Sequence, residues 1–498
     1  MSSWPGTSWA RRRGRSRGES PRAAVLVVAV LSVLVSACSG ATTRASGPVR
    51  PPGHRPTTTT TGAGPTTTAP DASGAAWTTY GGSFTRTSAG DATPALTHAP
   101  ARAWTSPALD GAVYGEPLID QGQVLVATEN DTVYSLSATD GTVAWSLHLA
   151  SPVPAGMLPC GDITPVVGVT STMVIDQATG VVYVSAEQLS SGRVAHVLYA
   201  IDLANHQRLW SMTLDQPGWQ TPAQLQRTGL ALSANHVLVA FGGNFGDCGS
   251  YHGAVIGVPE SGTGPLLTYQ VPTANEGAIW APAGITVDAA GNVYVATGNG
   301  SAHPGQAFDR GNAVIELSSG LSEMQYFAPT NWADDNAEDL DLGSTSPILL
   351  GNGQLFVVGK EATAYLLDAS SLGGIGGQAA SRPVCNSRGG NAYLAPYVYV
   401  VCADTGQLAQ VKVGPGNALG SGWRWSSPSG GAGSPTIAYG VVWTIGADAQ
   451  VLYGVDPATG STRYRVPLDV GTPEHFAAPS AAGGLIVVAG SQAVEAFR

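Results

Sequence analysis

The stretch QGQVLVATENDTVYSLSATDGTVAW, from Gln121 to Trp145, decides the fold. Two apolar runs rich in β-branched residues flank a polar turn at Glu129 to Asp131, and a second turn follows at Ala138 to Gly141. This pattern predicts two antiparallel strands and the start of a third. A lone hairpin cannot bury its apolar face, so the rest of the chain has to supply neighbours for it.

The same pattern recurs along the chain, giving eight copies in all. Their equivalent apolar strands are 42 to 63 residues apart, counted at Val124, Val182, Val237, Val293, Phe356, Val398, Val441 and Ile486. Such periods, with about four short strands each, predict propeller blades rather than helical repeats. The expected fold is therefore all-β, an eight-bladed β-propeller of four-stranded antiparallel blades. Because the last copy ends at Arg498, the early segment Trp77 to Trp104 is expected to complete the final blade.

The composition agrees with one large β domain over residues 76–498. The chain has 65 Gly and 34 Pro, only 11% of its residues are charged, and the folded part shows no sustained helical periodicity. Frequent turn residues between β-branched runs are typical of an all-β domain. A single domain is the simplest expectation, since propellers often exceed the usual domain length.

Residues 1–37 have the features of a lipoprotein signal peptide. A basic segment with six Arg precedes the apolar run Ala23 to Val35, which is too short for a comfortable membrane span. The run ends in Leu34-Val-Ser-Ala-Cys38, which resembles a bacterial lipobox. We therefore expect Cys38 to carry a lipid that anchors the protein to the cell membrane on its extracytoplasmic face. The alternative is an ordinary signal peptide cut near Ala37.

The next segment, residues 38–75, is Pro- and Thr-rich and contains almost nothing to bury, which predicts a disordered tether. Removing residues 1–37 takes away six Arg and one Glu, so 17 basic and 33 acidic residues remain, a net charge of −16. This acidic balance argues against nucleic acid as a partner.

Four cysteines remain after Cys38 is assigned to lipid, an even number that predicts disulfides in an oxidising compartment. Of the three possible pairings, the sequence favours Cys385 with Cys402, close together in one blade, and Cys160 with Cys248, in adjacent loop regions. No CxxC or CxxCH is present, so neither a zinc ribbon nor a covalent c-type haem is supported.

The turns that lead to a Trp or Tyr in several repeats carry a family resemblance. SLSATDGTVAW, AIDLANHQRLW and GVDPATGSTRY are similar to the repeat A-x-D-x-x-T-G-x-x-x-W. This repeat is found in the PQQ-dependent (quinoprotein) alcohol dehydrogenases and in their non-enzymatic propeller relatives, including the bacterial outer-membrane assembly propeller. The resemblance covers Trp77 to Arg498. It implies the propeller fold and does not by itself settle activity.

The resemblance implies a Ca²⁺ site built from three residues. Asn299, in YVATGNG, matches an Asn that coordinates Ca²⁺, Asp341, in NAEDLDLGSTSPIL, matches the general base beside the metal, and Asp247 lies near the place of the acidic ligand. Oxygen atoms of these side chains suit Ca²⁺, and a carboxylate there could accept the proton of an alcohol. The structural alternatives are a Gly-Asn hairpin turn, a solvated loop carboxylate and a cap before Cys248. Leu340 replaces the Trp expected before Asp341.

The same resemblance implies a pocket for the quinone PQQ. Trp280, in AIWAPAGITVD, matches an indole on the pocket floor, where it would stack on a planar cofactor. Lys360, in FVVGKEATAYLLD, matches a basic residue that contacts the quinone oxygens. The alternatives are a packing Trp between blades and a salt bridge from Lys360 to Asp341 or Glu361.

Two departures from the enzymes weigh against catalysis. The enzymes hold two adjacent cysteines over the quinone, whereas Cys160 has no neighbouring Cys, and no cytochrome domain is attached. Glu116 and His475 are expected near the central channel.

Three functions therefore stay open. The first is a scaffold that binds a partner protein or small ligand at the propeller funnel, and the second is a PQQ- and Ca²⁺-dependent dehydrogenase that oxidises an alcohol or sugar-like substrate. The third is a surface protein that binds carbohydrate or another polymer. The enzyme requires Asn299, Asp341 and Lys360 to converge at one end of the propeller axis.

Overall fold

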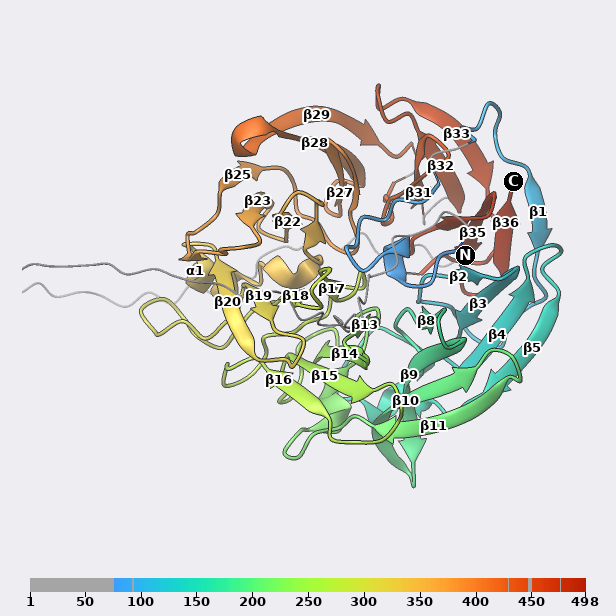
Figure 1. Cartoon of the computed structure of the whole chain (residues 1–498), viewed down its shortest axis with the longest axis horizontal. Helices are drawn as coiled ribbons and strands as arrows, with labels where there is room; N and C mark the ends of the chain where they lie inside the picture. The colour runs from blue at the N-terminus through green and yellow to red at the C-terminus, as the bar shows by residue number, and fades with distance from the viewer. Residues whose placement is uncertain (1–75, 92–93, 429, 447–449, 475) are drawn as a thin grey trace, which may run out of the picture. The chain divides into compact units, whose positions relative to one another are not determined.

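The computed structural model describes residues 76–498 except 92–93, 429, 447–449 and 475. Its strands form eight antiparallel sheets arranged around a common axis, as Figure 1 shows. The eight-bladed propeller expected from the repeat spacing is thereby confirmed. The signal peptide, Cys38, the tether and His475 lie outside the described residues. Within the described part, no helix is long and apolar enough to cross a membrane.

Each blade runs from an innermost strand on the axis to an outermost strand at the rim. Blade 1 contains β2 (Leu118–Asp120), β3 (Gln123–Ala127), β4 (Thr132–Ser137) and β5 (Val143–His148). Blade 2 contains β8 (Val174–Asp176), β9 (Val181–Ser190), β10 (Arg193–Asp202) and β11 (Gln207–Thr213). Blade 3 contains β13 (Ala231–Ser233), β14 (His236–Gly243), β15 (Ala254–Pro259) and β16 (Leu267–Gln270), and blade 4 contains β17 (Thr286–Val287), β18 (Val293–Ala296), β19 (Val314–Leu317) and β20 (Glu323–Ala328).

Blades 5 to 8 repeat the arrangement. Blade 5 contains β21 (Ile348–Leu349), β22 (Gln354–Val358), β23 (Thr363–Asp368) and β25 (Ala380–Pro383). Blade 6 contains β26 (Ala392–Leu394), β27 (Tyr397–Cys402), β28 (Gln407–Gly414) and β29 (Ala418–Ser426). Blade 7 contains β30 (Thr436–Ala438), β31 (Val441–Gly446), β32 (Val451–Val455) and β33 (Thr462–Pro467), and blade 8 contains β34 (Ser480–Ala482), β35 (Leu485–Ala489) and β36 (Val494–Phe497) with β1 (Arg102–Thr105).

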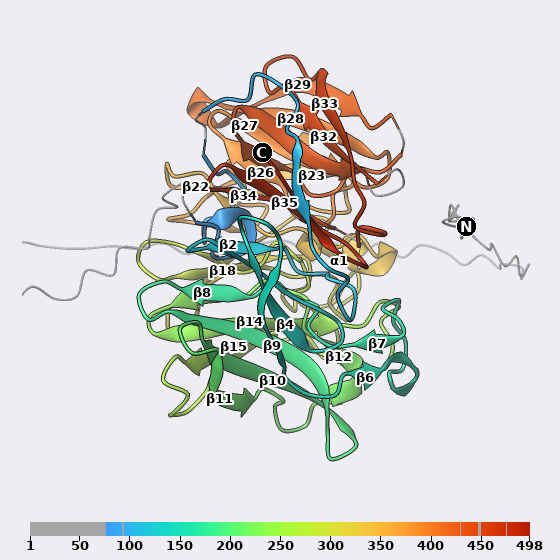
Figure 2. The same cartoon turned by 90° about the vertical axis from the view of Figure 1, so that its right-hand side faces the viewer.

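A few short elements lie outside this pattern. β12 (Gln224–Leu225) pairs with β14, β24 (Gly374–Ile375) extends blade 4 in parallel with β20, and β6 (Val153–Pro154) pairs with β7 (Val166–Val167). The single α-helix of the described residues is α1 (Trp332–Glu338), and short 3₁₀ turns occupy η1 (Tyr80–Gly82), η2 (Ala155–Met157), η3 (Thr221–Ala223), η4 (Leu342–Ser344) and η5 (Pro415–Asn417). Figure 2 shows α1, β6 and β7 on the same side of the ring.

The cores lie between neighbouring blades, because both faces of the middle strands are apolar. Val124, Val182 and Val293 are fully buried, whereas the rim strand β5 is mostly exposed. The predicted apolar runs therefore form the second strand of each blade. Burial on both faces explains why these strands have continuous apolar runs rather than an alternating pattern.

The ring closes through its first strand. β1 pairs antiparallel with β36, with Arg102 opposite Phe497, so the N-terminal part of the domain supplies the outermost strand of blade 8. The sequence placed this strand within Trp77 to Trp104, and the paired residues are Arg102 to Thr105. This pairing covers the outer edge of β36, which would otherwise be a free sheet edge.

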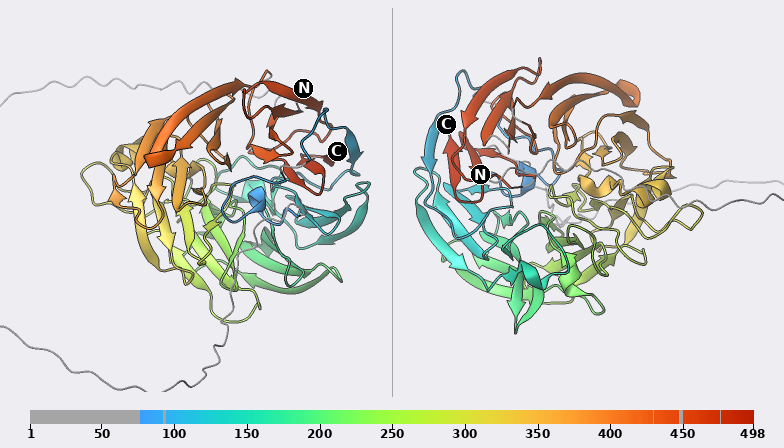
Figure 3. Two further views of the ribbon diagram at one scale, coloured as in Figure 1. Left: turned by 45° about the horizontal axis from the view of Figure 1, so that its top comes forward. Right: turned by 180° about the vertical axis from the view of Figure 1, so that it is seen from behind.

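The earlier residues, Trp77 to Asp91, take a different course that the sequence did not predict. This channel segment winds along the axis, where Figures 1 and 3 show it in blue near the middle of the ring. It hydrogen-bonds innermost strands or the residues beside them in blades 1 to 7, through Ile119, Ile175, Leu230, Val287, Leu349, Tyr393 and Ile437. In blade 8, a Cβ on Gly90 would lie only 2.7 Å from the carbonyl oxygen of Ala481. The segment therefore touches all eight blades.

Buried polar groups hold the channel segment in place. Arg86 is 1% exposed, and its guanidinium donates hydrogen bonds to the carbonyls of Ile285, Leu230 and Tyr80. Glu116 accepts a hydrogen bond of 2.7 Å from the amide of Gly81, and burial raises the pKa of this carboxyl to about 8. Glu116 thus lies at the axis, as the sequence predicted.

Candidate functional site

The candidate site lies where the second strands of blades 4 and 5 end. Asn299 follows β18, Lys360 follows β22, and Asp341 lies between α1 and the innermost strand β21. Glycines precede both strand-end residues: a Cβ on Gly298 would lie 2.4 Å from Asp341 Oδ1, and a Cβ on Gly359 would lie 2.4 Å from the carbonyl oxygen of Asp341. The loop that carries Asp341 can pass this close only because both positions lack a side chain.

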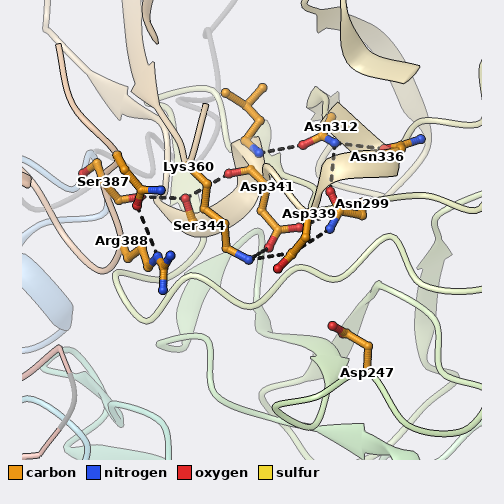
Figure 4. A network of polar contacts seen from close by, with 12 residues as sticks. Asp247, Asn299, Asn312, Asn336, Asp339, Asp341, Ser344, Lys360, Ser387 and Arg388 are labelled. Atoms are coloured by element: carbon orange, nitrogen blue, oxygen red, sulfur yellow. Dashed lines mark hydrogen bonds and ion pairs between the residues drawn. The ribbon is translucent and has the colours of Figure 1, made fainter. Parts of the chain in front are cut away.

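A chain of short contacts joins these residues, as Figure 4 shows. Lys360 Nζ lies 2.5 Å from Asp341 Oδ2 and 2.8 Å from Asp339 Oδ1. The backbone N–H of Asn299 donates to Asp341 Oδ1 at 2.8 Å, and the Asn299 side-chain amide donates to Asp339 Oδ1 at 2.9 Å. We call Asn299, Asp339, Asp341 and Lys360 the Lys360 network. The salt bridge from Lys360 to Asp341, one of the alternatives raised by the sequence, is present.

Asp339 belongs to the network although its sequence context gives no functional signal. It ends α1 in a left-handed conformation with φ 57°, which Asp tolerates better than most residues. This turn brings Asp339 and Asp341 to the same ammonium group. Their exposure differs, since the Asp339 side chain is 63% exposed and the Asp341 side chain only 10%.

Two buried asparagines support the network from behind. Asn312 donates to Asn299 Oδ1 at 3.1 Å and to Asn336 Oδ1 at 2.9 Å, and its own oxygen accepts from the amide of Leu342. Asn336, on α1, also accepts from the amide of Gly300. These contacts fix the loop after α1 against the end of β18. Sequence reasoning missed both residues, because an Asn beside a strand or in a short helix has no distinctive pattern.

Trp280 reaches the site from the segment before β17. Lys360 Nζ lies 5.8 Å from the Trp280 ring centroid, within the range of a cation–π contact. The Phe476 ring lies 6.0 Å from the Trp280 ring, and the Arg227 guanidinium lies 5.0 Å from the Phe476 ring. The two aromatic rings therefore lie next to each other at this end of the axis, with one cation on either side of the pair. The family resemblance places the Trp280 indole on the floor of a cofactor pocket. In this structure the neighbouring aromatic ring of that indole is Phe476.

Asp247 lies near the network but apart from its contacts, as Figure 4 shows. Its carboxylate accepts a hydrogen bond of 2.6 Å from Tyr251 Oη. Burial, together with the charges of Asp341 and Asp339, raises the pKa of Asp247. The structure thus brings Asn299, Asp341, Lys360 and Trp280 together and leaves Asp247 beside them.

Carboxylates outnumber cations in this region. Burial raises the pKa of Glu276 to about 7, and the nearby charges of Asp247, Asp341, Asp309 and Asp339 add to the shift. Burial works against the charged form of Lys360, but Asp341 and Asp339 outweigh it and raise the pKa of Lys360. The end of the axis is therefore acidic around one firmly charged ammonium group.

The residues present do not fit a calcium ion as they stand. Both Asp341 oxygens and the Asn299 side-chain oxygen, which would be needed as ligands, already accept hydrogen bonds or an ion pair from this chain. Among the described residues, no group of three or more His, Cys, Asp or Glu side chains could hold a metal ion. Ca²⁺ ordinarily takes six to eight oxygen ligands.

A second group of buried carboxylates lies between blades 1 and 2. Glu129, Asp131 and Glu187 surround Gly168, and we call them the Gly168 cluster: the Gly168 amide donates to Glu129 at 2.7 Å, and the Glu187 amide donates to the Gly168 carbonyl. A Cβ on Gly168 would lie 2.6 Å from Asp131 Oδ1. Asp131 and Glu187 are 0% and 2% exposed, and neither side chain accepts a hydrogen bond from the described residues.

Both predicted disulfides are present. Cys160 is bonded to Cys248, and Cys385 is bonded to Cys402. The first joins the loop that precedes blade 2 to the loop after β14, close to Asp247. It links two separate loops, unlike the adjacent cysteines of the dehydrogenases that the sequence resembles.

Comparisons with known proteins agree with the propeller fold. The family model described as outer membrane protein assembly factor BamB matches residues 84–243. This match covers less than half of the chain, and it agrees with the repeat turns. No curated protein matches the sequence.

Solved structures of two kinds share the fold. Quinohemoprotein alcohol dehydrogenase ADHIIG from Pseudomonas putida HK5 has a TM-score of 0.66 at 13% identity, covering 85% of this chain and 80% of its own. A europium-containing methanol dehydrogenase has a TM-score of 0.63 at 12% identity, with coverage of 84% and 90%. BamB from Moraxella catarrhalis has a TM-score of 0.54 at 13% identity, with coverage of 81% and 99%. At these identities the likeness shows the fold alone.

Proposed function

We propose that this protein is an extracytoplasmic, lipid-anchored binding propeller. Its Lys360 end holds a positively charged ligand, or a basic segment of a partner protein. The observation that carries the proposal is the surplus of carboxylates around Lys360, with Asp247, Glu276 and Asp339 beyond the pair made with Asp341. Such a surface attracts cations and disfavours anions.

Two further features support a binding role. The oxygens of Asp341 and Asn299 are engaged within the chain, so the site is already ordered before any ligand arrives. An ordered site loses little entropy on binding. The lipobox at Cys38 and the oxidised cysteine pairs support a location outside the cytoplasm.

Binding of short charged peptides tests the proposal. Trilysine should raise the unfolding midpoint of the full chain by mass action, whereas triglutamate should leave it unchanged. The shift should shrink in high salt and in Asp339→Asn, because screening and loss of a carboxylate both weaken the attraction. Equal shifts with both peptides, or none with trilysine at saturating concentration, would overturn the proposal.

Lipidation is tested separately. Cells expressing the full chain should incorporate labelled palmitate and hold the protein in the membrane fraction, and Cys38→Ala should abolish both. Labelling that persists in Cys38→Ala would show that the lipid is attached elsewhere or that the lipobox assignment is wrong.

A PQQ- and Ca²⁺-dependent dehydrogenase is the second candidate. The convergence of Trp280, Asn299, Asp341 and Lys360 favours it, with Asp341 as the base, and the engaged oxygens count against it. The test is a thermal-unfolding scan with Ca²⁺, with PQQ and with both. We expect no shift, and a shift that requires both ligands would restore the enzyme.

A further inference from the structure

The ammonium group of Lys360 occupies the most acidic position of the Lys360 network. It lies 2.5 Å from an oxygen of Asp341 and 2.8 Å from an oxygen of Asp339, and its side chain is only 13% exposed. The backbone N–H of Lys360 also donates to the Asp341 carbonyl at 2.9 Å. Lys360 therefore joins the end of β22 to the loop after α1 by three contacts. The other lysine of the chain, Lys412, is exposed on β28 and provides a matched control.

Two carboxylate oxygens face this position. Asp341 contributes one oxygen and Asp339 another. The Asn299 carboxamide turns its nitrogen toward them, because its N–H donates to Asp339 Oδ1 and its oxygen accepts from Asn312. Carboxylate and carboxamide oxygens are the ligands that hard divalent and trivalent cations prefer. A primary ammonium carries one charge and three donors, which suits two carboxylates without further ligands.

We infer that Lys360 takes the structural place of a metal ion in this propeller. Its ammonium group neutralises Asp339 and Asp341 and ties their loop to blade 5, so the site assembles without a metal. Removing the ammonium leaves the carboxylates of Asp339 and Asp341 facing one another with no cation. That vacancy binds an oxygen-preferring metal ion, and Lys360→Met converts the metal-independent site into a metal-dependent one.

Terbium luminescence provides the test, because an indole near a bound Tb³⁺ sensitises its emission and Trp280 lies beside Lys360. The full-length wild type and Lys412→Met should show no Trp-sensitised emission and no change in unfolding midpoint with CaCl₂ or EDTA. Lys360→Met should gain both the emission and a midpoint that rises with CaCl₂ and falls again with EDTA. Lys360→Arg, which keeps the charge, should behave like the wild type.

Two results would overturn the inference. The first is Trp-sensitised emission in the wild type that Asp341→Asn removes, since the native site would then already hold a metal. The second is a folded Lys360→Met protein that gains no metal response, since the oxygens would not form a ligand set. If Lys360→Met folds only in the presence of CaCl₂, that result supports the inference. The emission of the wild type tests whether the native site holds a metal, and this measurement does not depend on how the variant folds.

Discussion

The Lys360 network, at blades 4 and 5, and the Gly168 cluster, at blades 1 and 2, both bury carboxylates, but they compensate the charge differently. In the Lys360 network, Asp341 is 7% exposed and has an ammonium group and a backbone amide as partners. In the Gly168 cluster, Asp131 is 0% exposed and its carboxylate accepts no hydrogen bond from the described residues. A buried carboxylate needs a cation or a proton to offset the loss of water. This fold therefore uses both solutions.

Among the variants of the two sites, Asp341→Ala should cause the largest loss of unfolding free energy. The substitution leaves Lys360 largely buried without its main partner, which typically costs about 3 to 5 kcal/mol of unfolding free energy. Urea unfolding of the full chain measures the loss. The double variant Asp341→Ala/Lys360→Met should cost clearly less than the sum of the two single changes, because the orphaned charge is gone. Additive losses would show that the pair is not coupled.

The second-largest effect should be the change of stability with pH, which we assign to the carboxyl groups of the Gly168 cluster. Burial, with the charges of neighbouring carboxylates, raises the pKa of Asp131 to about 9, and burial raises that of Glu129 to about 7. Their unfolded values are near 4, so between these limits the folded state binds more protons. Stability is therefore greatest on the acid side and is lost as pH rises through the folded pKa values.

The expected loss between about pH 6 and about pH 9 is on the order of a few kcal/mol. His196 acts in the same direction: burial opposes its charge, but Asp215 and Glu187 outweigh burial and raise its pKa to about 9. Unfolding midpoints across this range measure the trend. Asp131→Asn should flatten it, and a midpoint that rises toward pH 9 would contradict the assignment of protons to this cluster.

Asp131→Asn at about neutral pH should itself cost little, less than about 1 kcal/mol, since the amide replaces a carboxyl that is already neutral. Position 131 has φ 56°, a conformation that Asn tolerates well. Urea unfolding beside Asp341→Asn gives the contrast directly. A loss at position 131 as large as that at position 341 would mean that Asp131 is ionised and paired.

The smallest effect should follow Asp339→Asn. Its side chain is 63% exposed, and an ion pair at such a position contributes about 0 to 1 kcal/mol. The variant should keep its unfolding midpoint while weakening the binding of trilysine. A stability loss as large as that of Asp341→Ala would show that Asp339, rather than Asp341, is the main partner of Lys360.

The sequence predicted the blades because their signal is local and repeated. Each blade needs an apolar second strand and a polar turn, and the regular spacing of these runs fixes the number of blades. The course of Trp77 to Asp91 was not predictable in this way. These residues are rich in Gly, Ser and Thr and have no period, and their conformation depends on contacts with strands spread over the whole chain.

The candidate site was predictable only in part, through motifs. Asn299, Asp341, Lys360 and Trp280 came from family resemblance, and their roles in binding or catalysis remain predictions. Asp339 was missed because α1 is too short to show a helical pattern. Glu129 and Asp131 were read as a polar turn, yet they are 4% and 0% exposed. Blade 2 packs over this turn, and a hairpin pattern gives no sign of what will cover it.

The contacts of the N-terminal segment have a consequence for the order of folding. Residues 77–105 leave the ribosome before every blade, yet their partners extend from Ile119 to Arg498. Contacts so distant in sequence form slowly, because a long loop must close before any of them is made. Seven blades can pair their strands as they emerge, whereas blade 8 and the axis have to wait for the last residues. The first residues of the domain to be synthesised are thus among the last to reach their native positions.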